Sequence, residues 1–126
     1  MNTDKNLLHS DVTERVLGAA LEVSNTLGAG FLEKVYERAL MRELVLRGVR
    51  ASSQASLSVF YKGERVGDYF ADIVVEERVV VELKCVEALG AAHTAQCLNY
   101  LRASGKRVCL LLNFQKPRLE WNRVVV

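Results

Sequence analysis

The chain has 126 residues, of which half are hydrophobic and a quarter are charged. This balance is typical of an ordinary globular protein and excludes an intrinsically disordered chain. The formal net charge of +2 excludes recognition of nucleic acid through bulk positive charge, so any such contact must come from a local patch or through a metal ion bound to phosphate. We predict one domain over residues 1–126.

The N-terminal segment and the cysteines indicate an intracellular protein. The first ten residues lack the long apolar stretch of a signal peptide, and no apolar run approaches the length of a membrane span. Cys85, Cys97 and Cys109 are spaced twelve residues apart without a CxxC pair, which is a poor framework for zinc or disulfides. We therefore expect a cytoplasmic protein with three buried free thiols.

Two helices are predicted first. Ser10 is a plausible N-cap for a helix with an apolar face that Gly28 ends. A second helix begins near Phe31 and ends at Gly48. Its predicted buried side consists of Leu32, Val35, Tyr36, Ala39, Leu40 and Leu44.

Strand patterns follow the helices. Alternation over 57–61, a turn at Lys62-Gly63 and a long strand over 65–75 predict a hairpin, and a β-branched strand over 79–86 follows it. The remaining elements are a helix over 91–104 that ends at Gly105, a buried strand over 107–113 and an edge strand over 119–126. The predicted fold class is α/β, a mixed sheet flanked by helices in the order ααβββαβ.

The segment YFADIVVEERVVVELK contains the strongest candidate site. Glu82 and Lys84 are two residues apart in a strand, so both side chains leave one face of the sheet. If residues 76–78 form the turn, counting back from it puts Asp72 opposite Glu82, with the side chains about 5 Å apart. A slip of one residue in this register would separate the two carboxylates.

Two opposed carboxylates favour a hard divalent cation between them. Two carboxylates with a main-chain carbonyl suit Mg²⁺, which keeps several waters and binds substrate phosphate. Such an ion can activate a water for attack, and Lys84 would hold that water and offset negative charge. The alternative is structural: Asp72 caps a bulge while Glu82 and Lys84 form a solvated polar face. The apolar surroundings, VVVELKCV, favour a buried strand, in which a charged side chain is costly unless a partner compensates it.

Three further residues are candidates for the same site. Gln96 and Tyr100 share a helix face and could bind a phosphate or a metal-bound water, although a buried tyrosine with a satisfied hydroxyl explains the pair equally well. Glu33 is either a third acidic group or a carboxylate that favours the helix dipole. His93 is more typical of a helix cap, and we assign it no role.

Three segments resemble the GxxExxY protein family of the PD-(D/E)xK nuclease superfamily: GAGFLEKVYERAL, YFADIVVEERVVVELKCVEAL and HTAQCLNYLRASGKRVCLLLNF. The resemblance implies a restriction-endonuclease-like αβββαβ core. It also implies that Asp72 and Glu82 bind metal together with the Leu83 carbonyl, and that Lys84 is the catalytic lysine.

The resemblance extends to the accessory residues, with two departures. Gln96 and Tyr100 look like the QxxxY element of RecB-type members, and Glu33 like their helical acidic residue. Ala71 stands where the superfamily has its eponymous proline. Ser24-Asn25 stands where many relatives have His-Arg, which puts an accessory contact from the first helix in doubt.

We therefore expect a nuclease that uses Mg²⁺, or alternatively Mn²⁺, to hydrolyse phosphodiester bonds in DNA or RNA, with DNA favoured. The alternative is a non-catalytic module on a nuclease fold that binds nucleic acid or protein as a subunit of a repair or defence complex. A homodimer is plausible, because a chain this small often needs a second copy to span a duplex. The cations that could line a substrate groove are Lys62, Arg65, Lys106, Arg107, Lys116, Arg118 and Arg123.

Overall fold

The computed structural model describes residues 7–126, so residues 1–6 of the predicted domain lie outside the described residues. Within this range the structure contains three helices and one five-stranded sheet. The elements are α1 (Ser10–Leu27), α2 (Glu33–Leu46), β1 (Ala51–Tyr61), β2 (Glu64–Val75), β3 (Val79–Lys84), α3 (Ala91–Ser104), β4 (Val108–Asn113) and β5 (Glu120–Val125). The predicted α/β class and the order ααβββαβ, followed by β5, are confirmed.

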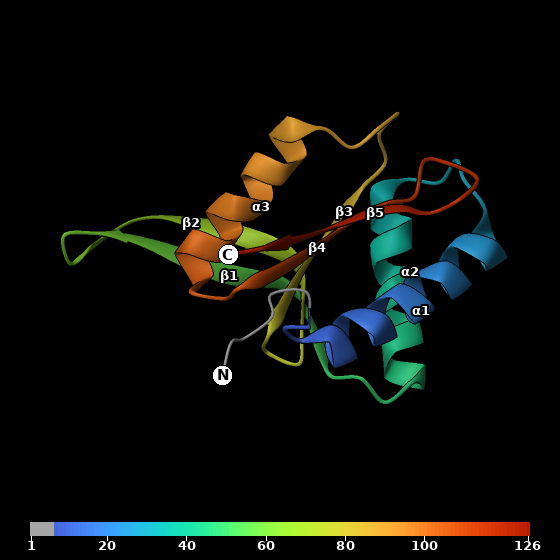
Figure 1. The fold of residues 1–126 in the computed structure, drawn as a ribbon, viewed down its shortest axis with the longest axis horizontal. Helices are drawn as coiled ribbons and strands as arrows, with labels where there is room; N and C mark the ends of the chain where they lie inside the picture. Colours follow the sequence, from blue (N-terminus) through green and yellow to red (C-terminus); the bar gives the residue numbers. More distant parts are fainter. Residues whose placement is uncertain (1–6) are drawn as a thin grey trace.

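The strands lie in the sheet in chain order, β1-β2-β3-β4-β5. Among the strands within residues 7–126, only the pair β3–β4 is parallel, and α3 connects these two strands. Helices α1 and α2 cover one face of the sheet, while α3 covers the other (Figure 1). The larger apolar core lies under α1 and α2 and includes Tyr36, Leu40 and Phe114. A smaller core lies under α3 and includes Cys97 and Leu101.

The β1–β2 hairpin extends beyond the body of the sheet. Strand β2 pairs with β3 only over Ile73–Val75, whereas its pairing with β1 continues to the turn. Figure 1 shows the hairpin projecting away from β4 and β5, with α3 above its base. The outer part of the hairpin exposes a set of large apolar side chains: Phe60, Tyr61, Val66, Tyr69 and Phe70.

The helix starts differ from the sequence predictions. The side chain of Ser10 caps nothing; its carbonyl accepts a bond from the Thr13 hydroxyl, and the residue before α1 is His9 in the left-handed conformation. On α2, the predicted burial of Leu32 and Val35 is wrong, since they are 79% and 37% exposed. The helix begins only at Glu33, and a single stripe spaced by four residues faces the sheet.

Two strand ends also differ, and each has a physical reason. Strand β1 begins at Ala51 rather than at residue 57, because its polar start pairs with β2 through the backbone alone. Strand β3 ends at Lys84 rather than at residue 86. Beyond it, the buried Asn113 side chain takes over the pairing: its amide oxygen accepts a bond from the Val86 N–H, and its amide nitrogen donates to the Val86 carbonyl.

Cys97 and Cys109 are buried free thiols as predicted, but Cys85 is only half-buried. Cys85 follows the end of β3, where the sheet no longer covers it, and its thiol lies 3.9 Å from the Phe31 carbonyl oxygen. None of the described helices combines the length and apolarity that crossing a membrane requires.

The hydroxyl of Tyr36 fixes the loop before α2. It donates to the Gly28 carbonyl at 2.6 Å and accepts a bond from the Phe31 N–H at 3.2 Å, while its ring stacks on Phe114 at 4.7 Å. Tyr36→Phe is expected to lower the free energy of unfolding by about 1–3 kcal/mol, because both loop groups lose their partner. Urea denaturation checks this, with the exposed Tyr61→Phe as control; equal losses in the two variants would contradict it.

Candidate active site

Strands β2 and β3 part at Asp72 and Glu82. The turn at residues 76–78 and the pairing of Val75 with Val79 are as predicted, and the ladder ends at Ile73 and Val81. One step further, side chains replace the backbone pairing. The Asp72 N–H donates to Glu82 Oε2 at 2.7 Å, and the Leu83 N–H donates to Asp72 Oδ2 at 2.8 Å. The two predicted acids therefore lie together at the point where the hairpin leaves the sheet.

Burial and mutual repulsion perturb both acids. Glu82 is 2% exposed, and burial together with the negative charge of Asp72 raises its pKa to about 8. Burial also raises the pKa of Asp72, although the bond from the Leu83 N–H partly offsets this. At neutral pH the pair therefore retains a proton on Glu82 unless a cation compensates the charge. Pairs of this kind are typical of functional sites.

Helix α3 supplies the neighbours of Lys84. The ammonium group donates to Gln96 Oε1 at 2.7 Å, and Gln96 Nε2 lies 3.4 Å from the Tyr100 hydroxyl. That hydroxyl donates in turn to Glu82, and burial raises the pKa of Tyr100 so that it keeps its proton. The structure thus brings together Lys84, Gln96, Tyr100 and Glu82 in one hydrogen-bonded chain.

Glu33 reaches the rim of this group from the start of α2. The residue is exposed as a whole, but its carboxylate is partly buried and accepts a bond from the Cys85 backbone N–H. This partial burial, followed by the charge of Asp72, raises the pKa of Glu33. Its position at the first residue of α2 also fits the helix dipole, so both interpretations of Glu33 remain consistent with the structure.

A further acid, Glu37, was missed from the sequence. It is 6% exposed and accepts bonds from Lys34 Nζ at 3.2 Å and Gln54 Nε2 at 3.0 Å. Its charge contributes to the raised pKa values of Asp72 and Glu33. Glu37 could have been found from its position four residues after Glu33, which places both carboxylates on the same helix face.

The donor set fits a hard divalent cation without being a closed cage. No group of three or more His, Cys, Asp or Glu within residues 7–126 is arranged to hold a metal ion. Asp72 and Glu82 supply two carboxylates, and Mg²⁺ characteristically binds one or two carboxylates and takes its other ligands from water and phosphate. The Leu83 carbonyl as a further ligand stays a prediction.

The cations predicted to line a groove are mostly engaged elsewhere. Arg65 pairs with Asp68, Lys106 donates to the Glu77 carbonyl, and Arg107 donates to the Val126 carbonyl. His93 acts as a cap, since its Nδ1 accepts a bond from the Gly90 N–H at 3.0 Å. These three cations thus have partners within the protein, and their lining of a substrate groove stays a prediction.

The chain thus combines a mixed sheet that has helices on both faces with two opposed carboxylates at a splayed strand pair. A lysine follows the second acid by two residues. A family model described as the PD-(D/E)XK nuclease superfamily matches residues 10–124. The chain belongs to this superfamily.

Solved structures share the fold. The crystal structure of SSO0001 superposes with a TM-score of 0.59 at 16% identity, covering 96% of this chain and 60% of that one. The present chain therefore spans only 60% of the length of that protein. An alkaline exonuclease, LHK-Exo from Laribacter hongkongensis, gives a TM-score of 0.50 at 10% identity, covering 90% of this chain and 81% of that one, and its complex with dAMP gives the same TM-score and identity. None of the curated proteins matches.

Proposed function

We propose that the chain is a divalent-metal-dependent nuclease that hydrolyses phosphodiester bonds in DNA. The observation that carries the proposal is the meeting of the Asp72 and Glu82 carboxylates where β2 and β3 part, with Lys84 two residues further on the same face. Ionising both the buried Glu82 and the half-buried Asp72 is costly, as their raised pKa values indicate, and a metal ion held between them would offset that cost.

Asp72 and Glu82 would hold Mg²⁺ or Mn²⁺, with the Leu83 carbonyl as a third protein ligand. When bound, the ion lowers the pKa of a coordinated water and polarises the phosphoryl oxygen. Each carboxylate keeps one oxygen on a backbone N–H, at 2.7 Å and 2.8 Å, which orients the other oxygen. This preorganisation is what a metal site requires of its protein.

Lys84 would hold the attacking water and stabilise the negative charge that develops on the phosphate. Its bond to Gln96 at 2.7 Å fixes the ammonium group without neutralising it, because the amide carries no charge. Tyr100 positions the Glu82 carboxylate through its hydroxyl, and Gln96 links Tyr100 to Lys84. Glu33, at the rim, is proposed as a third acidic group that reaches the metal through water.

A second function has one observation in its favour. Asp72 and Glu82 each accept a hydrogen bond from a backbone N–H of the other strand, so the pair also holds β2 and β3 together. A non-catalytic module on the nuclease fold, binding nucleic acid or protein, would retain these structural hydrogen bonds. Measuring the affinity for Mg²⁺ discriminates between the nuclease and the non-catalytic module, since a purely structural acid pair needs no metal ion.

Within the superfamily, we infer membership of the GxxExxY family. Gly30, Glu33 and Tyr36 supply its motif, and Tyr36 secures the loop that carries Gly30 and presents Glu33 to the site. DNA is the favoured substrate class, which the likeness in fold to an exonuclease solved with dAMP supports. A homodimer, a single domain over 1–126 and a cytoplasmic location stay predictions.

Asp72→Asn is expected to lower metal-dependent cleavage at least about 100-fold, because one carboxylate ligand is lost. The amide keeps an oxygen acceptor for the Leu83 N–H, so folding is preserved. Purified protein is incubated with single-stranded, linear duplex and nicked DNA under Mg²⁺ or Mn²⁺, with the exposed Asp11→Asn as control. Cleavage that persists in Asp72→Asn at the wild-type rate would overturn the assignment of the site.

A further inference from the structure

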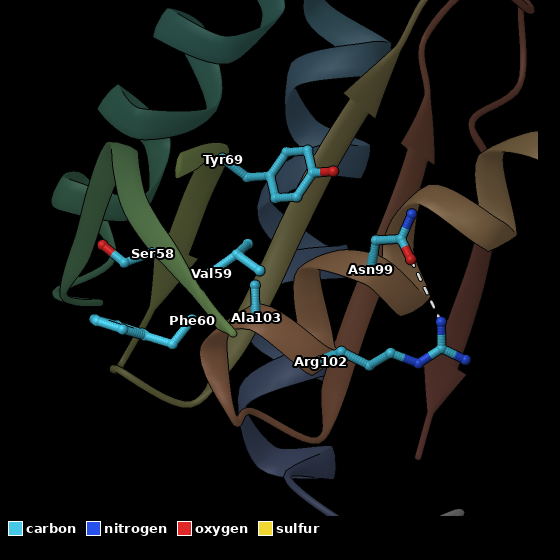
Figure 2. A pocket seen from close by; sticks show the side chains of 7 residues that line it. All are labelled: Ser58, Val59, Phe60, Tyr69, Asn99, Arg102 and Ala103. Carbon is cyan, nitrogen blue, oxygen red and sulfur yellow. Dashed lines mark hydrogen bonds between the residues drawn. The ribbon is translucent and has the colours of Figure 1, made fainter. Parts of the chain in front are cut away.

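A pocket lies between the β1–β2 hairpin and α3, beside the acidic site but outside it. Its cavity volume is about 550 Å³, and Figure 2 shows its lining side chains. These are Ser58, Val59, Phe60 and Tyr69 from the hairpin and Asn99, Arg102 and Ala103 from α3. None of them belongs to the acidic site or to its predicted neighbours.

The pocket combines exposed aromatic rings with an apolar base. Tyr69 and Phe60 are 46% and 65% exposed although they are large apolar side chains on a projecting hairpin. Val59 from the hairpin and Ala103 from α3 supply the small apolar side chains of the lining (Figure 2). Exposed rings along a groove are the surface on which single-stranded nucleic acids stack their bases.

The polar groups at the α3 side suit a nucleotide. Arg102 donates to the Asn99 amide oxygen at 3.4 Å, as the dashed line in Figure 2 shows. Within residues 7–126 Arg102 forms no ion pair with a carboxylate, so its positive charge is not neutralised by the protein. A guanidinium group with free N–H donors binds phosphate, and an amide side chain can pair with the polar edge of a base.

A single aromatic contact connects the pocket to the acids. The ring of Tyr69 packs edge-on against Tyr100, with centroids 5.7 Å apart and an interplanar angle of 82°. The Tyr100 hydroxyl in turn donates to Glu82. Two side-chain contacts, Tyr69 to Tyr100 and Tyr100 to Glu82, therefore link the pocket to the acidic site.

We propose that this pocket binds an unpaired base of single-stranded DNA next to the cleaved phosphate. Tyr69 stacks on the base, and Arg102 contacts the backbone phosphate. The proposal rests on the proposed function for the role of the neighbouring acids. It makes single-stranded DNA, or a single-stranded end of a duplex, the substrate class, because a paired and stacked base cannot offer its face to a ring.

The test measures binding rather than cleavage. A fluorescein-labelled 16-nucleotide oligo-dT is titrated with the full chain in EDTA, and the same titration is made with an abasic oligonucleotide of equal length. Tyr69→Ala is expected to weaken oligo-dT binding about tenfold and to leave abasic binding unchanged, because the ring stacks only on a base. Arg102→Ala is expected to weaken both about fivefold, since it contacts phosphate.

Matched controls separate the pocket from general effects. Phe70→Ala removes an exposed ring from the neighbouring position of β2, which faces the other side of the strand, and Arg42→Ala removes one positive charge from α2. Neither should change oligo-dT binding, and Tyr69→Phe should bind as the wild type does. The proposal would be overturned if Tyr69→Ala lost the same affinity for both oligonucleotides, or if the wild type preferred duplex DNA. It would also be overturned if Tyr69→Ala lost no affinity for oligo-dT, which is the result expected if the pocket binds a peptide.

The two proposals fail separately. Base-dependent binding without metal-dependent cleavage would reject the nuclease function and retain the pocket as a binding site for single strands. Metal-dependent cleavage together with DNA binding that Tyr69→Ala does not weaken would reject the base-binding pocket and retain the nuclease function.

Discussion

Lys84→Ala is expected to lower the rate of metal-dependent DNA cleavage by about 10²- to 10⁴-fold, the range seen when a group that assists proton transfer or stabilises charge is removed. Lys84 is the only charged donor in the chain of bonds that joins Gln96, Tyr100 and Glu82. Mg²⁺ affinity should change far less, because no proposed metal ligand is removed.

Single-turnover cleavage with saturating Mg²⁺ measures this loss, and calorimetry measures metal binding in the same variant. Lys106→Ala is the matched control, since its ammonium group donates to the Glu77 carbonyl at the opposite end of β3. Gln96→Ala should give an intermediate loss, because it frees Lys84 without removing its charge. A Lys84→Ala variant as active as Lys106→Ala would rule out its catalytic role.

The second large effect is on the pH dependence of stability. Burial and the charge of Asp72 raise the pKa of Glu82 from 4.5 to about 8 in the folded chain. Between these values the folded chain keeps a proton that the unfolded chain releases. The free energy of unfolding therefore falls as pH rises, by roughly 1 kcal/mol for each pH unit, and the loss is complete above about pH 8.

Glu82→Gln is expected to remove this slope and to be the more stable protein at pH 8, by roughly 3 kcal/mol. The amide still offers an oxygen to the Asp72 N–H. Urea unfolding at pH 5, 6, 7 and 8 measures the slope, and the exposed Glu87→Gln controls for the loss of a charge. Mg²⁺ should raise the free energy of unfolding of the wild type at pH 8 and leave that of Glu82→Gln unchanged. Parallel slopes in the wild type and Glu82→Gln would contradict the buried acid pair.

The strand pattern was sufficient to predict the geometry of the acid pair. A polar tripeptide between two β-branched runs determined the turn, and counting from that turn predicted that Asp72 meets Glu82. The period of two residues predicted that Glu82 and Lys84 share a face, and α3 contributes Gln96 to that face. These inferences depend only on local backbone geometry, which sequence spacing reports well.

Features that depend on tertiary packing could not be predicted. Leu32 and Val35 are apolar yet exposed, because only one stripe of α2 faces the sheet. Glu37 is buried because Gln54, on a different element, supplies a partner. The pocket at Tyr69 exists because the hairpin continues past the end of β3, and sequence spacing alone does not show where a sheet ends.

The sequential order of the sheet allows the site to assemble from neighbouring segments of the chain. Each strand joins beside its predecessor, so the sheet can grow in the order in which the chain is synthesised. Asp72 and Glu82 are ten residues apart on one short hairpin and meet through a contact of low contact order. The partner of Lys84, Gln96, lies on α3 and so requires the crossover to be in place. We therefore expect the two acids to come together before α3 adds Gln96 and Tyr100 to the site.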